Sequence, residues 1–290
     1  MDGFFAPWRA LRHDPRWASK LGIAALVFWV PYVGPFLVLG WTLEWMTAVA
    51  WGRESVLPEW TDWGRLLKRG FFGYVVVLPY SLALMVAWYC VAGIATVMAG
   101  TGAGGTLAIA VAIGTDQALA IGLVMSIAVA VLTAASMVCA LFAAGLALAP
   151  VTHAATLRYA LFDSVREGLE VRQALDSLGR SPRTALRAWS YGVAVQVFLM
   201  LVYVPLVYGL ILGPWALAAA GVATGMPEDV MTLVALAGQM LSPIASVLAC
   251  VVSVATSVAT AHWWGTHGRA AYGLGSAAAG RPARGDEPAG

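Results

Sequence analysis

Charged residues are scarce in this sequence: Asp, Glu, Lys and Arg make up only 11% of its 290 residues. A typical soluble domain carries about 25% charged and about 45–50% apolar residues, whereas 60% of this chain is hydrophobic. The shortage of charge excludes an ordinary soluble enzyme, and the abundance of apolar residues excludes a disordered chain. An integral membrane protein remains, and we expect an all-α, polytopic one.

Residues that commonly carry chemistry are also few. The three cysteines and the four histidines show no disulfide, paired-ligand or metal-site spacing, and they are Cys90, Cys139, Cys250, His13, His153, His262 and His267. Gly100, Gly102 and Gly105 spell GxGxxG, but they follow an apolar helix rather than a strand. The net charge of +2 is too small to indicate nucleic-acid binding. We therefore expect no enzyme activity, no cofactor, no metal and no nucleic-acid partner.

What the sequence does contain is long uncharged runs. A membrane-spanning helix needs about 20 apolar residues to cross about 30 Å of hydrocarbon. Runs of this kind predict four spans at about 72–99, 118–149, 186–212 and 230–264. The glycines of 100–105 predict a loop after the first span, and residues 273–290 read as a flexible cytoplasmic tail.

The N-terminal apolar region, 17–51, differs because Pro31, Gly34 and Pro35 break it. The pieces on either side reach roughly 21–24 Å at about 1.5 Å per residue, which is short of a full crossing. We predict a helical hairpin that dips into the membrane. Two short spans are the alternative.

All 17 Lys and Arg residues fall in four groups, within 9–20, 53–69, 158–187 and 269–284. Cytoplasmic loops collect Lys and Arg, and an N-terminal hairpin places every group on one side. We therefore expect an inner-membrane protein with both termini in the cytoplasm. Residues 1–20 would form a cytoplasmic segment, and 17–272 a single transmembrane domain.

Two segments are predicted to lie at the cytoplasmic surface. The interfacial segment 53–70 places Trp60, Trp63 and Leu66 on one helical face, ahead of the first span. Residues 156–178 carry mixed charges and form either a docking surface for a partner or anionic lipid, or an ordinary solvated loop. Ser181-Pro182 then predicts the start of another helix.

Short motifs in the N-terminal part look familiar. They are Asp14-Pro15-Arg16-Trp17, Gly34-Pro35, Gly40-Trp41, Gly70 and Leu57-Pro58-Glu59-Trp60-Thr61-Asp62-Trp63-Gly64. Together they resemble an uncharacterised prokaryotic membrane family, domain of unknown function 4013. That family often has a basic residue soon after the position of Trp41, where this chain has Glu44. The resemblance implies a multi-helix inner-membrane protein and brings no activity. It marks Pro58, Glu59, Trp60, Asp62 and Trp63 as a candidate interfacial motif.

Glu44 is the one carboxylate in the membrane zone, and burying such a charge is costly. It could bind a proton or cation. Alternatively, it faces the headgroups or pairs with an arginine such as Arg53. Three prolines inside the spans could break helices around a substrate or simply kink them, and they are Pro79, Pro205 and Pro243.

The last span carries small residues at every fourth position: Ala245, Ala249, Ser253, Ser257, Ala261 and Gly265. Such a stripe allows close helix packing in lipid, either within the chain or at the interface of a homo-oligomer.

Two functions follow from these observations. The first is a non-enzymatic interaction or membrane-organising protein, embedded in the lipid bilayer and with a protein partner on the cytoplasmic face. The alternative is a small transporter or channel component that uses Glu44 and the proline-broken helices.

Overall fold

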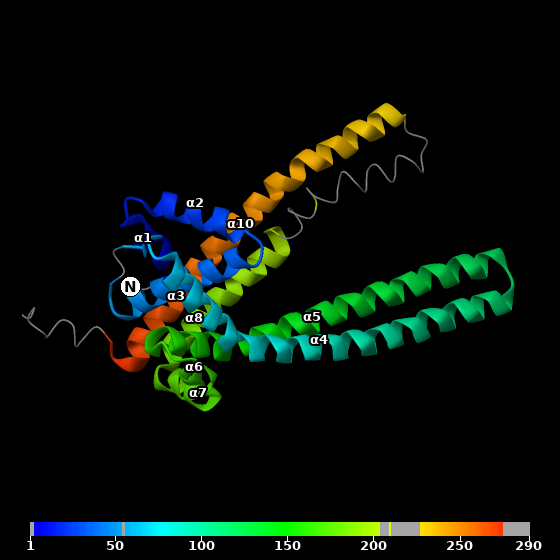
Figure 1. The fold of residues 1–290 in the computed structure, drawn as a ribbon. Coiled ribbons are helices and arrows are strands. Elements are labelled where there is room, and N and C mark those ends of the chain that lie inside the picture. The colour runs from blue at the N-terminus through cyan, green and yellow to red at the C-terminus, as the bar shows by residue number, and fades with distance from the viewer. Residues whose placement is uncertain (1–2, 54–55, 204–208, 210–226, 275–290) are drawn as a thin grey trace, which may run out of the picture. The chain divides into compact units, whose positions relative to one another are not determined.

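A computed structural model describes residues 3–53, 56–203, 209 and 227–274 of the chain. Within these ranges the protein is helical and contains no strand (Figure 1). The elements are α1 Ala6–Arg12, α2 Trp17–Phe28, α3 Val33–Ala50, α4 Trp63–Ile113, α5 Asp116–Phe162, α6 Val165–Leu169, α7 Val171–Arg180, α8 Pro182–Phe198, the π-helix η1 Leu199–Tyr203 and α10 Glu228–Tyr272.

Four of the described helices are long and apolar enough to cross a membrane: α3, α4 over Trp63–Ile94, α8 with η1, and α10. The predicted span 118–149 lies within α5, an uninterrupted helix of 47 residues. The fold class is therefore confirmed as an all-α polytopic membrane protein. Except for Gly209, the predicted end of the third span at 204–212 lies outside the described residues, as does the tail beyond 274.

The chain forms two compact units, which are described separately. Unit 1 comprises residues 1–76 and 153–290, and unit 2 comprises residues 77–152. Unit 2 is the hairpin of α4 and α5, which reverse direction at Gly114, where φ is +71°. Thr115 caps α5 by accepting a hydrogen bond from the Ala118 amide at 3.1 Å.

The loop predicted at 100–105 is wrong, because α4 continues through these glycines to Ile113. Glycine in a helix costs only about 1 kcal/mol relative to alanine. An apolar segment gains more by keeping its backbone hydrogen bonds internal, since lipid offers no alternative partners. The local glycine signal is therefore overridden by the surrounding apolar sequence.

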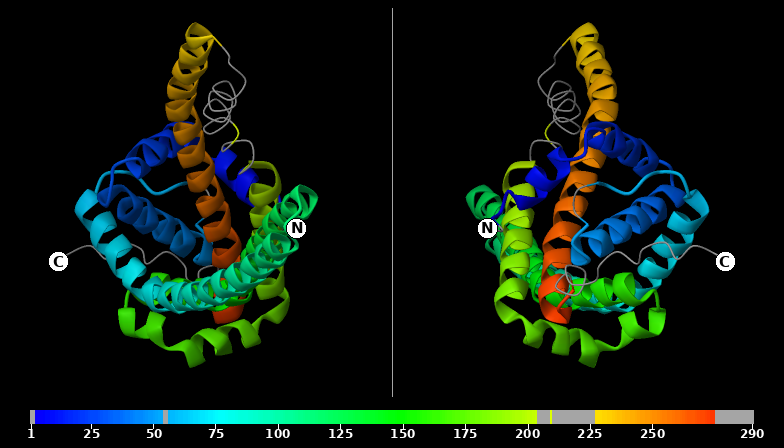
Figure 2. Two further views of the ribbon diagram at one scale, coloured as in Figure 1. Left: turned by 90° about the vertical axis from the view of Figure 1, so that its right-hand side faces the viewer. Right: turned by 90° about the vertical axis from the view of Figure 1, so that its left-hand side faces the viewer.

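In unit 1, α10 is the central helix, with α3 on one side and α8 on the other (Figure 2). The largest buried side chains gather around it, among them Trp41, Trp45 and Trp264. Trp45 of α3 stacks on His262 of α10, with ring centroids 6.2 Å apart, and so packs the N-terminal hairpin against the C-terminal half of α10. The core of unit 1 therefore depends on residues from both ends of the chain.

The predicted N-terminal hairpin is present as α2 and α3. Its turn includes Tyr32, which is 87% exposed and has φ of +63°. Gly34 allows close contact with α2, because a Cβ there would come within 2.0 Å of the Val27 carbonyl oxygen. Helix α3 begins at Val33, ahead of Pro35, because Pro35 lies in the first turn, where an amide N–H is not needed.

Helices α3 and α4 cross backbone to backbone at Gly40 and Gly70. A Cβ on Gly40 would lie 2.0 Å from the Leu66 carbonyl oxygen, and one on Gly70 would lie 1.7 Å from that of Phe36. Any side chain at either position would force the helices apart. This crossing brings the middle of α3 to the first two turns of α4 and so determines what Glu44 can reach.

Candidate functional site

The interfacial motif does not form one helix. Its first part, residues 56–62, is not helical. It is held by a cluster that we call the N-terminal latch: the buried ion pair of Asp14 and Lys20, with Glu59 and the Leu57 backbone. Asp14 and Lys20 are only 2% and 3% exposed. The Lys20 Nζ donates to Asp14 Oδ2 at 2.8 Å and to the Leu57 carbonyl at 2.7 Å, and it lies 2.9 Å from Glu59 Oε1.

The latch keeps Asp14 charged. Burial alone raises the pKa of its carboxyl group, but hydrogen bonds from Lys20 and from the Arg16 and Leu57 amides, with the Lys20 charge, lower it further than burial raises it. The net pKa is therefore below the usual value. Asp14 is an ionised carboxylate that receives one ammonium and two backbone donors.

Two tryptophans attach the segment 56–62 to α3. The Trp41 indole donates to the Pro58 carbonyl at 2.9 Å, and its ring stacks on Trp60 with centroids 5.2 Å apart. Asp62 caps α4 through the Arg65 amide at 3.0 Å. The helix predicted to include Trp60 therefore begins at Trp63. In this structure the motif ties the hairpin to the start of α4, while Trp63 itself is exposed.

Glu44 lies at the α3–α4 crossing and its side chain is 11% exposed. Its carboxylate is 3.2 Å from Arg65 Nη2 and 3.9 Å from Arg69 Nη1. Arg69 also donates to Thr47 Oγ1 at 2.9 Å and to the Ala160 carbonyl at 2.6 Å. The expectation of an arginine partner holds, but the partners are Arg65 and Arg69. Arg53, which the sequence suggests as a possible partner of Glu44, forms no ion pair with it.

Two adjoining cavities open beside Glu44, with volumes of about 530 and 610 Å³. Both are lined by Thr47, Arg65 and Arg69; the first adds Lys68 and Asp163, and the second adds Glu44 and Arg53. Four cationic and two acidic side chains thus share this space. Most of the charge is already paired, so the cavities are polar pockets rather than a strongly positive site.

The mixed-charge segment after α5 is ordered by one buried side chain. Arg158, 4% exposed, donates to the Glu167 carbonyl at 3.0 Å and to the Tyr272 hydroxyl at 3.2 Å. It also hydrogen-bonds the side chains of Glu167 and Gln173. We call the resulting surface of α6 and α7 the platform, residues 165–180. Arg158 fixes it to the ends of α5 and α10.

The small-residue stripe is used partly within the chain. Ala245 and Ala261 are buried, and a Cβ on Gly265 would lie 2.8 Å from the Met46 carbonyl oxygen of α3. Ser257 is exposed, and Ala249 and Ser253 are half-buried. An interface between copies of the chain through this stripe stays a prediction.

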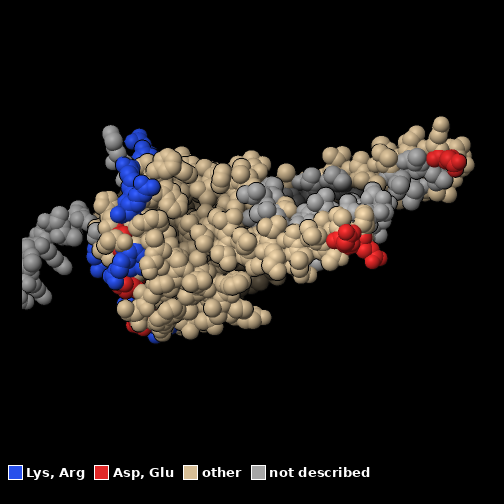
Figure 3. Space-filling model, turned by 90° about the horizontal axis from the view of Figure 1, so that it is seen from above, with Lys and Arg blue, Asp and Glu red and all other residues tan. Residues whose placement is uncertain are grey.

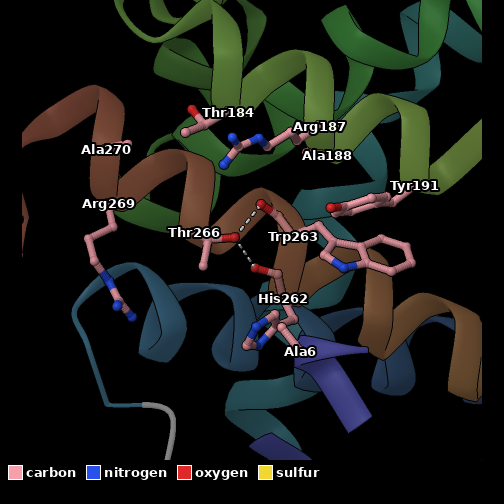
Figure 4. A pocket seen from close by; sticks show the side chains of 10 residues that line it. All are labelled: Ala6, Thr184, Arg187, Ala188, Tyr191, His262, Trp263, Thr266, Arg269 and Ala270. Atoms are coloured by element: carbon pink, nitrogen blue, oxygen red, sulfur yellow. Dashed lines mark hydrogen bonds between the residues drawn. The ribbon is translucent and has the colours of Figure 1, made fainter. Parts of the chain in front are cut away.

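A smaller cavity of about 210 Å³ lies between α8 and α10 (Figure 4). Arg187 and Tyr191 project from α8 towards Trp263 and Thr266 of α10. Arg269 turns towards α3, where it donates to the Val49 carbonyl at 3.2 Å. The sequence did not single out this cavity, because its residues come from distant parts of the chain.

The Lys and Arg side chains of unit 1 gather at one end. Figure 3 shows them where α10 ends, together with some acidic side chains, whereas the start of α10 carries Glu228 and Asp229 and no described Lys or Arg. Among the described residues, no group of three His, Cys, Asp or Glu side chains could hold a metal ion.

Fold and sites together define a polytopic helical membrane protein with a polar, ordered structure at its basic end. The chain belongs to the family described as Protein of unknown function (DUF4013), whose model matches residues 23–208. The matched region includes Glu44, the interfacial motif and Arg158, but neither Asp14 nor any part of α10. No curated protein and no solved structure matches the chain.

Proposed function

We propose that this protein is a non-enzymatic interaction protein of the inner membrane, with both termini cytoplasmic, and that it binds a protein partner through the platform. The observation that carries the proposal is the buried Arg158. A connection that merely joins two membrane helices does not need a buried cation with four hydrogen bonds, because loops usually lie on the protein surface in contact with water. Fixing the segment gives it a defined shape.

The surface that the platform presents suits a protein partner. Helix α7 buries Ala174 and Ser177 and exposes Val171 and Leu175, which are one turn apart. Arg172 is exposed beside them. An apolar pair flanked by charge on a fixed helix is the usual composition of a small docking surface, where the apolar residues supply burial and the charges supply orientation.

The distribution of charge supports the orientation. The platform lies beside the C-terminal end of α10 (Figure 1), the end at which Lys and Arg gather in Figure 3, and Lys and Arg are retained on the cytoplasmic side of inner-membrane proteins. The α2–α3 hairpin agrees with this, because α2 has 12 residues and reaches only about 18 Å. A hairpin that returns to its own side keeps both ends of the chain in the cytoplasm.

The test is native mass spectrometry of complexes extracted in mild detergent. We expect a heteromeric mass that Arg172→Glu or Leu175→Ser reduces at least about tenfold in abundance. The matched control is Arg12→Glu, which makes the same charge change at an exposed position on α1. A protein that is always found without a partner protein, or a complex that survives both platform variants, contradicts the proposal.

One observation favours the transporter alternative: the 610 Å³ cavity that Glu44 lines. A proton- or cation-coupled flux through this cavity would need the Glu44 carboxylate. Glu44→Gln should then abolish flux in reconstituted vesicles, whereas an interaction protein shows no flux that depends on this residue.

A further inference from the structure

We propose that the cavity between α8 and α10 binds a phosphate group, that of a phospholipid headgroup. The site is defined by Arg187, Tyr191, Trp263 and Thr266, together with Thr184 and Arg269 at its edge. It is separate from the platform, and its residues lie in α8 and α10, with Ala6 of α1.

The first argument is charge. The described residues that line the cavity include two arginines and no carboxylate. Arg187 forms no ion pair with any described residue, and its side chain points into the cavity in Figure 4. In the larger cavities near Glu44, by contrast, the arginines face acidic partners. An arginine without a carboxylate in a concave site is suited to an oxyanion, which its planar fork can bind with two hydrogen bonds.

The second argument is an unused donor. Trp263 is 4% exposed, and its indole Nε1 has no hydrogen-bond partner within the described part of the chain. A buried N–H without a partner costs roughly 1–3 kcal/mol, and such groups are rare in native structures. A phosphate oxygen in the cavity would accept this hydrogen bond. The Tyr191 hydroxyl is a further donor on the same wall.

The third argument is position. Phe4, Tyr191 and Trp263 form a cluster with ring centroids 5.4–5.6 Å apart, and Tyr and Trp prefer the headgroup layer of a bilayer. Further along α8 and into η1, Phe198 and Leu201 are exposed and apolar, as expected for a surface in contact with acyl chains. In the other direction Arg183 is exposed. The cavity therefore lies at the boundary where lipid phosphates reside.

The experiment measures lipid retention by the full-length protein in detergent. Native mass spectrometry is recorded after titration with phosphatidylglycerol, and, in a separate arm, equilibrium dialysis with inorganic phosphate. We expect one phosphatidylglycerol molecule to be retained, and Arg187→Gln to weaken its binding at least about tenfold. Trp263→Phe keeps an aromatic side chain, although a smaller one, and removes the N–H donor, so we expect about threefold weaker binding or more.

The matched control is Arg183→Gln, one turn earlier on α8, exposed and outside the cavity. It should retain the lipid as the unchanged protein does. Should Arg187→Gln fail to fold, as judged by size-exclusion elution, Trp263→Phe decides the question alone.

The two sources of phosphate give different results. Retention of lipid with no binding of inorganic phosphate supports the headgroup. Binding of inorganic phosphate with the same dependence on Arg187 and Trp263, and no lipid retention, supports a phosphate site but overturns the lipid assignment. Equal binding by all variants, or equal loss in Arg183→Gln, overturns the site itself.

Discussion

Replacing Lys20 by methionine should destabilise unit 1 strongly, because it removes one partner of a buried ion pair. Methionine keeps the length and apolar character of the side chain but leaves the Asp14 carboxylate without its cation. Breaking a buried pair in this way typically costs about 3–5 kcal/mol. The same change also leaves the Leu57 carbonyl without its side-chain donor.

The structure places the expected value towards the lower end of that range. Asp14 would keep two backbone donors, the Arg16 amide at 2.8 Å and the Leu57 amide at 3.0 Å. Glu59 is 42% exposed, so water can replace its contact with Lys20. We therefore expect the free energy of unfolding to fall by about 3 kcal/mol.

The assay is equilibrium unfolding in detergent micelles, followed by tryptophan fluorescence, to which Trp41 and Trp60 contribute together with the other tryptophans of the chain. Removing both charges in Asp14→Leu with Lys20→Met should recover most of the loss, since apolar replacement of a whole buried pair is often neutral. Glu59→Gln should cost no more than about 1 kcal/mol. A loss below about 1 kcal/mol for Lys20→Met, or no recovery in the double variant, would refute the assignment of a buried pair.

Three further results are expected. Asp14 has a lowered pKa in the folded state, so its stabilising effect is present above the unfolded pKa of about 3.9 and is lost as pH falls through the folded pKa. Asp14→Asn should therefore reduce the pH dependence of the free energy of unfolding in that range, and an unchanged pH dependence counts against the latch. Gly40→Ala should destabilise by about 1–3 kcal/mol or more through steric overlap with α4, whereas Gly22→Ala, which has open space around it, should be neutral or slightly stabilising in thermal unfolding; similar losses in both would contradict the helix crossing. Arg158→Met should increase amide hydrogen exchange across 165–180, the platform; unchanged exchange there would show that Arg158 does not hold it.

The membrane class and the hairpin could be predicted because they depend on local sequence. A sufficiently long apolar run is stable only inside a membrane or a large protein core. Pro31 and Pro35 prevent one continuous helix across the N-terminal region. Both conclusions need only neighbouring residues, and the structure confirms both.

The partners of Glu44 could not be predicted, because they depend on a helix crossing. Arg65 is 21 residues away, and it meets Glu44 only because Gly40 and Gly70 let α3 and α4 approach closely. The sequence contains both glycines but not the angle at which the helices cross. The transport role of Glu44 stays a prediction.

The sequence predicts a candidate docking surface at 156–178, but it indicates neither the latch nor the role of Arg158, for a related reason. Lys20 was counted among cytoplasmic cations, yet it lies inside an apolar helix, and that placement was the available signal for a buried partner. Arg158 contacts Tyr272, 114 residues further along the chain. A contact over that distance leaves no spacing pattern in the sequence.

The latch also has a consequence for how the chain enters the bilayer. A ribosome delivers the N-terminus first, so Asp14 and Lys20 emerge before Leu57, which lies 43 and 37 residues later. Until then the hairpin carries a charged pair that lacks its contacts with the Leu57 backbone. Since α2 reaches only about 18 Å, it is too short to act as a stop-transfer segment by itself. The latch can close only after Leu57 and Glu59 have been translated, so the final packing of the first helices follows the synthesis of the segment that precedes α4.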